Sequence, residues 1–301
     1  MAELTLARTD IERLPNYKRK TAQEYSAACP FCGASAGGAK KDGFIFWPDR
    51  GNYFCRKCRA KGFVTDGDGS WNGGGRDEFL AEVAKRADEE RATKRAAVEV
   101  MASQEDRAAM YHHQMRDRVY WHNQGLDDAT IDKHQLGYAE RCPTYQQSPS
   151  WTIPVWFRGK LLSIRHRLIK PARPGDKYRP EMAGLPAVIF NGDLFDQEQP
   201  LLVLVEGEIK AMALTQRGFP AVGIPGAATF KERWVPWFKK CLEVYVVFDP
   251  GAEAQAVRAA EMLGEQARLC RCPVKPDDFF VMYGGTSGQF NAVLSEGRRW
   301  T

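Results

Sequence analysis

Cysteine pairs and carboxylates at strand ends are the residues of this chain whose types and spacing suggest chemistry. Cys29 and Cys32 form one CxxC pair, and Cys55 and Cys58 form a second, with 22 residues between the pairs. Two such pairs can direct four thiolates at one ion, so the spacing predicts a tetrahedral zinc site. Because four protein ligands leave no open position for a reacting water, we expect this zinc to be structural.

The carboxylates follow two apolar runs. The run 201–205 ends at Glu206 before a helix-forming segment, and the run 243–248 ends at Asp249 before a helix-like stretch at 252–269. Unbroken apolar runs of this kind are typical of strands buried on both faces of a parallel sheet. The sequence therefore predicts an α/β sheet in this part of the chain.

Acids at the carboxyl ends of such strands point into the crevice where open α/β sheets bind ligands. A further acidic pair, Asp277 and Asp278, follows later in the chain. Because hard divalent cations prefer oxygen ligands, Glu206, Asp249 and Asp277 predict a magnesium or manganese site. The alternative for each strand-end acid alone is a cap on the helix that follows it.

Positive charge is concentrated in two regions, although the 301-residue chain carries a net charge of only +5. Residues 17–62 hold ten Lys or Arg against three acids, and residues 156–180 hold eight against one. Such regions predict a polyanionic partner such as nucleic acid, whereas a merely solvated surface is the alternative. The length allows two or three domains.

The second basic region reads as two strands, 151–157 and 161–169, joined by a turn. Arg165 and Arg167 fall on one face of the second strand by its two-residue period. With Lys177 and Arg179 they predict a groove that follows phosphates.

Two short strands, 44–48 and 52–54, are predicted between the cysteine pairs, as in a zinc ribbon. Their aromatic residues either stack on nucleic-acid bases or form the core of the ribbon, and Phe46 and Tyr53 fit both interpretations. No N-terminal apolar signal and no membrane-length apolar run is present, which predicts a cytoplasmic protein with no membrane partner. The remaining cysteines are then expected to be buried thiols, not disulfides.

The order of these parts resembles the bacterial DnaG-type and phage-type DNA primases. The stretch from Gly125-Leu126 to Gly137-Tyr138 is similar to the phrase that precedes the basic region of that family. Lys177-Tyr178-Arg179 lies where the family has a basic-aromatic motif, and Val205-Glu206-Gly207 resembles the glutamate motif of its TOPRIM domain. Phe248-Asp249 and Lys275-Pro276-Asp277-Asp278-Phe279 resemble its two further acidic motifs.

The resemblance implies an α/β multidomain protein. Its expected parts are a zinc ribbon at 1–70, a charged helical linker at 71–118, a mixed α+β basic subdomain at 119–196, and a Rossmann-like TOPRIM domain at 197–301. It also implies synthesis of short RNA primers on single-stranded DNA from NTPs by metal-dependent nucleotidyl transfer. Glu206, Asp249, Asp277 and Asp278 would be catalytic, any helicase partner would be a separate protein, and the compact layout suits a phage or mobile element.

The chain departs from the family at three acidic positions. Gly251, Lys210 and Lys275 stand where the family has carboxylates, and Glu253 is a possible substitute for one of them. Lys210 could contact the nucleotide triphosphate instead. If Lys210 neutralised the site by direct pairing with the acids, polymerisation would have to be abandoned and a binding role would remain. The alternatives are a non-catalytic nucleic-acid clamp resembling RecR and a TOPRIM nuclease.

Overall fold

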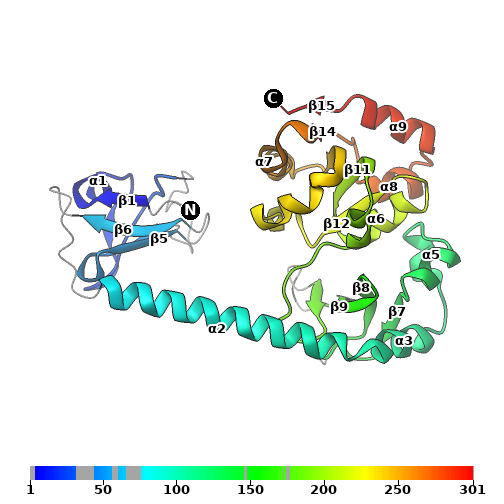
Figure 1. The fold of residues 1–301 in the computed structure, drawn as a ribbon, viewed down its shortest axis with the longest axis horizontal. Coiled ribbons are helices and arrows are strands. Elements are labelled where there is room, and N and C mark those ends of the chain that lie inside the picture. Colours follow the sequence, from blue (N-terminus) through cyan, green and yellow to red (C-terminus); the bar gives the residue numbers. More distant parts are fainter. Residues whose placement is uncertain are drawn as a thin grey trace. The chain divides into compact units, whose positions relative to one another are not determined.

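The computed structural model describes residues 4–31, 44–55, 60–65, 76–145, 148–171, 173 and 177–300. The chain forms two compact units, residues 1–89 and 90–301, and each is described by itself (Figure 1). Cys32, Cys58 and the first residues of the predicted linker, 71–75, lie outside the described residues. Within the described part, no helix combines the length and the apolar composition needed to cross a membrane.

The N-terminal unit is built on a six-stranded sheet in the order β1-β6-β5-β4-β3-β2. The predicted pair of strands is confirmed by β4 and β5, which a short 3-10 turn and Gly51 in the left-handed region connect. Phe46 and Tyr53 are 1% and 2% exposed, which confirms the core interpretation of both rings. The elements are β1 (Leu4–Ala7), α1 (Arg8–Glu12), β2 (Lys18–Arg19), β3 (Tyr25–Ala27), β4 (Phe44–Trp47), η1 (Pro48–Arg50), β5 (Asn52–Cys55) and β6 (Lys61–Thr65).

Helices precede the sheets of the C-terminal unit. The charged segment forms two helices, α2 (Arg76–Ala102) and α3 (Glu105–Gln114), and the short helices α4 (Val119–Asn123) and α5 (Asp128–Lys133) follow. A glycine ends the first of these short helices and an aspartate caps the second. Gly125 lies in the left-handed region after α4, and the side chain of Asp127 accepts a hydrogen bond from the Thr130 backbone N–H at the start of α5.

An antiparallel sheet in the order β10-β9-β8-β7 carries the basic residues. The two predicted long strands are confirmed as β8 (Ser150–Phe157) and β9 (Lys160–Leu168), and the edge strands are β7 (Gly137–Ala139) and β10 (Tyr178–Pro180). α3 packs against one face of this sheet, and Trp121 of α4 belongs to the large core on the other face.

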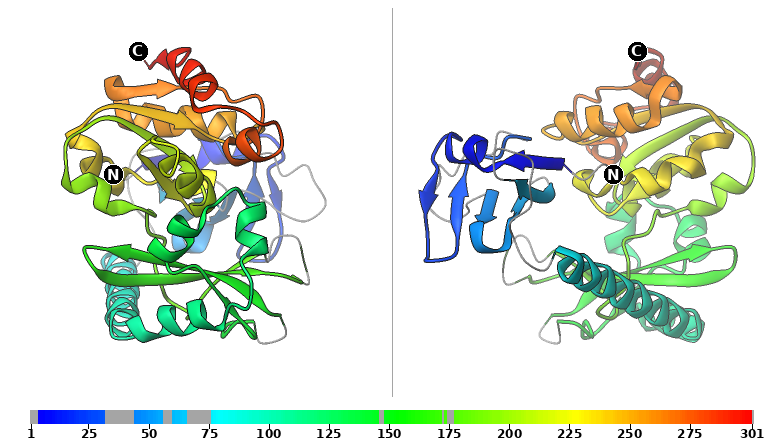
Figure 2. Two further views of the ribbon diagram at one scale, coloured as in Figure 1. Left: turned by 90° about the vertical axis from the view of Figure 1, so that its right-hand side faces the viewer. Right: turned by 60° about the vertical axis from the view of Figure 1, so that its left-hand side comes forward.

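A five-stranded sheet in the order β12-β11-β13-β14-β15 carries the acids (Figure 2). β11 pairs in parallel with β12 and β13, which confirms the predicted parallel strands. One face of the sheet packs against α6, α8 and α9, whereas the other packs against α7 and η5. The elements are η3 (Gly192–Asp196), β11 (Gln199–Glu206), α6 (Glu208–Thr215), β12 (Ala221–Ile224), η4 (Ala227–Thr229), η5 (Glu232–Lys240), β13 (Cys241–Val247), α7 (Glu253–Leu263), η6 (Gly264–Gln266), β14 (Ala267–Leu269), α8 (Pro276–Val281), α9 (Ser287–Ser295) and β15 (Arg298–Arg299).

The prediction of a helix over 252–269 is wrong for the second half of that range. α7 ends at Leu263, because Gly264 takes a positive φ of 70°, and residues 267–269 form the parallel strand β14 beside β13. Hydrogen bonds to β13 therefore override the helix propensity of this segment. Cys142, Cys241, Cys270 and Cys272 are all buried, as expected.

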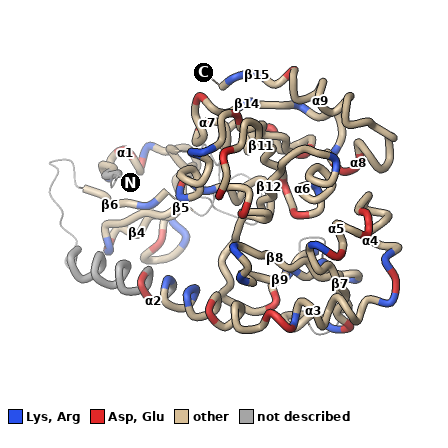
Figure 3. Tube along the Cα trace, turned by 45° about the vertical axis from the view of Figure 1, so that its right-hand side comes forward, with Lys and Arg blue, Asp and Glu red and all other residues tan. Residues whose placement is uncertain are grey.

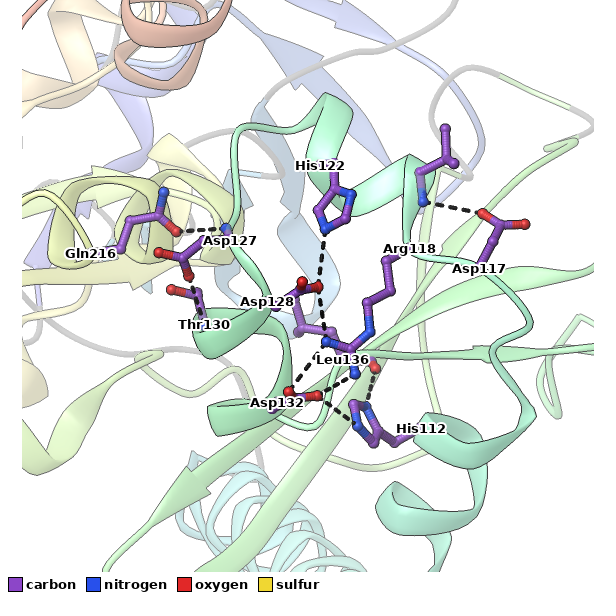
Figure 4. A network of polar contacts seen from close by, with 11 residues as sticks. His112, Asp117, Arg118, His122, Asp127, Asp128, Thr130, Asp132, Leu136 and Gln216 are labelled. Carbon is purple, nitrogen blue, oxygen red and sulfur yellow. Dashed lines mark hydrogen bonds and ion pairs between the residues drawn. The ribbon is translucent and has the colours of Figure 1, made fainter.

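A network of charged side chains joins the short helices of the C-terminal unit (Figure 4). Arg118 bonds Asp128 and Asp132, and His112 lies 3.2 Å from Asp132. At the edge of the network, the Gln216 amide at the end of α6 donates to the Gly125 carbonyl and accepts from the Asp127 N–H. α6 is thus tied to the segment between α4 and α5.

His134 should make the C-terminal unit sensitive to acid. The ring is 7% exposed, and burial, assisted by the charge of Lys133, lowers the pKa of His134 from 6.5 to about 4. The folded state favours the neutral ring, so this contribution is complete above pH 6.5 and is lost as the pH falls toward 4. We expect the free energy of unfolding to fall by up to about 1.4 kcal/mol per pH unit in this window.

Urea titrations between pH 4 and 7 measure this slope. His134→Asn should flatten it relative to the parent protein, whereas His113→Asn, a change at an exposed ring, should leave it unchanged. Equal slopes for His134→Asn and the parent would show that His134 does not titrate as described.

Gly137 allows α3 to approach β7 closely. A Cβ atom on Gly137 would lie 2.5 Å from the backbone carbonyl of Tyr111 in α3. Gly137→Ala must therefore move the helix, and we expect a loss of about 1–3 kcal/mol in the free energy of unfolding, measured in urea. Gly288→Ala is the matched control, because a Cβ at this α9 position would make only an ordinary contact of 3.9 Å with Thr286 Oγ1, and alanine favours a helix. That change should be neutral or stabilising.

Candidate functional site

Glu206 holds together the loops at the carboxyl ends of the parallel strands. It is the last residue of β11, and Gly207 with φ of 86° turns the chain into α6. Its Oε1 accepts a hydrogen bond from the Asp249 N–H at 2.9 Å, and its Oε2 accepts one from the Ala227 N–H at 3.2 Å. Glu206 therefore positions the backbone of Asp249 as well as adding its own charge.

Lys210 lies among the acids. Its Nζ lies 3.2 Å from Asp249 Oδ2, and its side chain is only 13% exposed. Burial alone would lower the pKa of Lys210, but the charges of Asp277, Asp249 and Glu206 outweigh it and raise that pKa. Lys210 therefore pairs directly with Asp249, which is the contact that argues against polymerisation, whereas Asp277 and Glu206 act on it through their charges.

Two of the strand-end and α8 acids each have an unsatisfied oxygen. Asp249 Oδ1 and Asp277 Oδ1 are shielded from solvent and accept no hydrogen bond from the residues that the structure describes. Buried carboxylate oxygens are costly unless a cation or a donor satisfies them, so both atoms are suited to a divalent cation. As they stand, however, no three His, Cys, Asp or Glu side chains of the described residues are grouped closely enough to hold a metal.

The other two candidate acids have separate positions. Asp278 follows Asp277 in the first turn of α8, and no polar contact among the described residues joins its side chain to Glu206 or Asp249. Glu253 accepts a hydrogen bond from the Gly251 N–H in its own turn. The Glu253 carboxylate therefore binds the turn before α7, and no contact among the described residues joins it to Glu206 or Asp249.

Tyr178 lies at the centre of the predicted basic residues. The guanidinium carbons of Arg165 and Arg167 lie 4.6 and 6.0 Å from its ring centroid, and Lys177 Nζ lies 6.0 Å from it. The common face predicted for the two arginines is therefore confirmed. Arg179 packs instead over Tyr145, at 5.6 Å.

The two arginines are already engaged within the protein. Arg165 is 14% exposed and forms an ion pair with Glu208 of α6, which is 2% exposed. Arg167 donates a hydrogen bond to Gln124 Oε1 at 3.2 Å. Arg165 thus joins the basic sheet to α6. The partner Glu208 could not be identified from the sequence, because it lies 43 residues from Arg165 and the pairing depends on tertiary packing.

A buried network behind β10 holds the basic strand. Glu181 Oε2 lies 2.6 Å from His166 Nε2, and His166 Nδ1 lies 2.8 Å from Ser150 Oγ. Glu181 Oε1 accepts hydrogen bonds from Arg107 and Tyr111. The order Ser, His, Glu resembles a hydrolytic triad, but each of these side chains is at most 2% exposed, so no substrate reaches it. The network is structural.

In the N-terminal unit, Cys29 and Cys55 are 2% and 0% exposed and belong to the same core cluster. The other two predicted ligands, Cys32 and Cys58, lie outside the described residues. Cys29 and Cys55 are thus buried in the same core as the aromatic residues of β4 and β5.

Solved primase structures share the fold of this chain. The zinc-binding and RNA polymerase domains of the Aquifex aeolicus primase match 97% of this chain and 83% of their own length, with a TM-score of 0.53 and 17% sequence identity. The RNA polymerase domain of Mycobacterium tuberculosis DnaG matches 67% of this chain and 84% of its own length, with a TM-score of 0.54 and 17% identity.

A DnaG catalytic domain bound to single-stranded DNA matches 69% of this chain and 83% of its own length, also with a TM-score of 0.54 and 17% identity. No family model matches the sequence, and no curated protein matches it. The chain therefore shares the fold of the catalytic core of DnaG-type primases, with 17% sequence identity to each of these structures.

Proposed function

We propose that this chain is a DNA primase that synthesises short RNA primers on single-stranded DNA by metal-dependent nucleotidyl transfer. The observation that supports this best is the contact between Glu206 and the Asp249 backbone at two neighbouring strand ends of a primase fold. Lysine and arginine side chains of β9 and β10 would hold the phosphates of the template and the primer.

Asp249 and Asp277, with Glu206, would hold a magnesium or manganese ion through their carboxylate oxygens. Such an ion supplies activation of the attacking 3′-hydroxyl and offsets charge on the reacting phosphate. Glu206 keeps the Asp249 loop in place through its two backbone hydrogen bonds. Asp278 remains a candidate for the same ion, and a separate helicase remains a proposed partner.

A non-catalytic nucleic-acid clamp is the second candidate. The ion pair between Lys210 and Asp249 favours it, because the ammonium neutralises one of the acids. Asp249 Oδ1 and Asp277 Oδ1, which have no hydrogen-bond partner among the described residues, favour the enzyme, since a clamp has no use for them. The ion pair weakens the attraction for a cation, yet it occupies only one oxygen of Asp249.

Incubation of the full chain with single-stranded DNA, labelled NTPs and Mg²⁺ or Mn²⁺ distinguishes the candidates. Ladders of short RNA support the primase. Binding of DNA without RNA synthesis supports the clamp, and shortened DNA supports a nuclease. The last two outcomes would each reject the proposed function.

We also propose that Cys29, Cys32, Cys55 and Cys58 bind one structural zinc ion. Metal analysis of the purified chain should give about one zinc per molecule. Cys29→Ser should unfold the N-terminal unit while the C-terminal unit keeps its unfolding transition, because so small a unit depends on its metal. Cys142→Ser, which alters a buried thiol outside that unit, should leave the zinc content unchanged. A parent protein without zinc would reject the site.

A further inference from the structure

A cavity of about 310 Å³ lies between the end of α5, the turn from β8 to β9 and the start of η3. Its volume is at the lower end of the range of ligand pockets, about 300–1,000 Å³. None of its lining residues is one of the acids or basic residues to which cation or phosphate binding was assigned above. The lining includes Lys133, His134, Gln135, Trp156, Asn191 and Asp193.

The backbone around the cavity has an unfavourable conformation. Among the described residues, four that are not glycine have a positive φ, and two of them, Gln135 at 49° and Asn191 at 62°, line the cavity. A third, Arg158 at 50°, comes directly before Gly159 of the lining. Gln135 follows the C-cap residue of α5, a position at which a left-handed residue is usually glycine. Non-glycine residues in this conformation cluster at functional sites, so we expect these side chains to have a use there.

Two neighbouring side chains at the cavity lack hydrogen-bond partners. His134 is 7% exposed, its ring packs beside Phe190, and no described residue bonds its ring nitrogens. Burial lowers the pKa of His134 to about 4, so at neutral pH one ring nitrogen donates and the other accepts. The Oε1 atom of Gln135 is also shielded from solvent and accepts no hydrogen bond from the described residues. A ligand with a donor and an acceptor close together would satisfy both side chains after a rotation of the Gln135 amide.

The charges and the aromatic ring of the lining indicate which ligand fits. Charges of both signs are spread over the C-terminal unit (Figure 3), and the cavity has one of each, the exposed Lys133 and Asp193. This balance does not favour a ligand of high charge. Trp156 is half-buried and follows an irregularity in the pairing of β8 with β9, a feature that re-aims side chains. Its indole gives the cavity a flat apolar surface suited to a planar ring.

We propose that this cavity binds an unpaired nucleobase, with donor and acceptor atoms of the base bonded to His134 and Gln135 and its ring beside Trp156. A nucleobase is a neutral planar ring that carries a donor and an acceptor next to each other on one edge, which is the combination that these three side chains match. The base belongs either to a free nucleoside or to a single strand of nucleic acid. The inference goes beyond primer synthesis, because the site uses none of the strand-end acids.

Isothermal titration calorimetry of the full chain with adenosine and with cytidine tests the site, and ribose is the probe without a base. We expect saturable binding of both nucleosides and none of ribose. Gln135→Gly should weaken nucleoside binding about 10-fold, as for the loss of one hydrogen bond. The same change should not lower the Tm, because glycine is favoured at this φ.

His134→Phe should weaken nucleoside binding by a similar factor, because it keeps a ring of similar size and removes both nitrogens. Asn16→Gly is the matched control. It also replaces an exposed left-handed residue by glycine, but in the N-terminal unit, and it should bind as the parent does.

Absence of saturable binding by either nucleoside, equal binding of ribose, or parental affinity in both the Gln135 and the His134 variants would each overturn the inference. Displacement of adenosine by a single-stranded oligonucleotide, but not by an abasic strand of the same length, would support the site and assign the base to a strand. Adenosine binding that neither strand displaces would support a site for free nucleosides. The primer assay is independent of this titration, so either proposal can fail while the other stands.

Discussion

Glu206→Gln should reduce primer synthesis by at least about 100-fold, the range seen when one group that stabilises a transition state is removed. The change deletes a negative charge beside Lys210. It also turns an amide NH₂ toward one of two backbone N–H donors, of Asp249 or Ala227, that now face carboxylate oxygens. Two facing donors cannot bond, so the Asp249 loop should shift.

RNA ladders on single-stranded DNA, with Mg²⁺ and with Mn²⁺, measure this effect. Binding of the same DNA, followed by fluorescence anisotropy, should change less than about 3-fold, because the phosphate contacts come from other residues. Glu232→Gln is the matched control, since it removes an exposed carboxylate from η5 of the same unit. Ladders of parental intensity from the Glu206 variant would show that this residue is not needed for catalysis.

Arg165→Met should cost about 3–5 kcal/mol in the free energy of unfolding of the C-terminal unit, as expected when one partner of a buried ion pair is removed. Glu208 is 2% exposed, and its Oε2 already lacks a partner. Without Arg165, a buried carboxylate would stand alone inside the apolar core that α6 shares with the sheets.

Urea unfolding of the single variants and of the double variant Arg165→Met, Glu208→Leu gives the coupling energy. The double variant should recover most of the loss, because no uncompensated charge remains. Arg158→Met serves as the control: Arg158 pairs with Asp196 at 65% and 39% exposure, and such surface pairs contribute under about 1 kcal/mol. If Arg165→Met and Arg158→Met reduced the free energy of unfolding by similar amounts, burial of the Arg165–Glu208 pair would not explain the effect.

The parallel strands and their acids could be predicted because the evidence is local. An apolar run that stops at Glu206 or Asp249 specifies both the strand and the end at which the acid lies. Strand β14 could not be predicted in this way, because residues 267–269 favour a helix unless β13 is beside them. Short segments whose structure depends on a distant partner are ambiguous from propensity alone.

The roles of the charged residues were harder to predict than their positions. Arg165 was predicted to bind phosphate, a role that stays a proposal, and the structure pairs it with Glu208, 43 residues away in sequence. Lys210 was recognised as a departure, but its contact with Asp249 depends on how α6 follows β11. Such pairings are set by tertiary packing, which periodicity and motif spacing do not report.

The attachment of α6 at both ends has a mechanical consequence. Glu208 at its start bonds Arg165 of the basic sheet, and Gln216 after its end bonds Gly125 and Asp127. An eight-residue helix is about 12 Å long. It therefore acts as a strut of fixed length that sets the gap between acids and basic strands. Adaptation to different ligands should then come from rotamer changes of long side chains, not from movement of the two sheets toward each other.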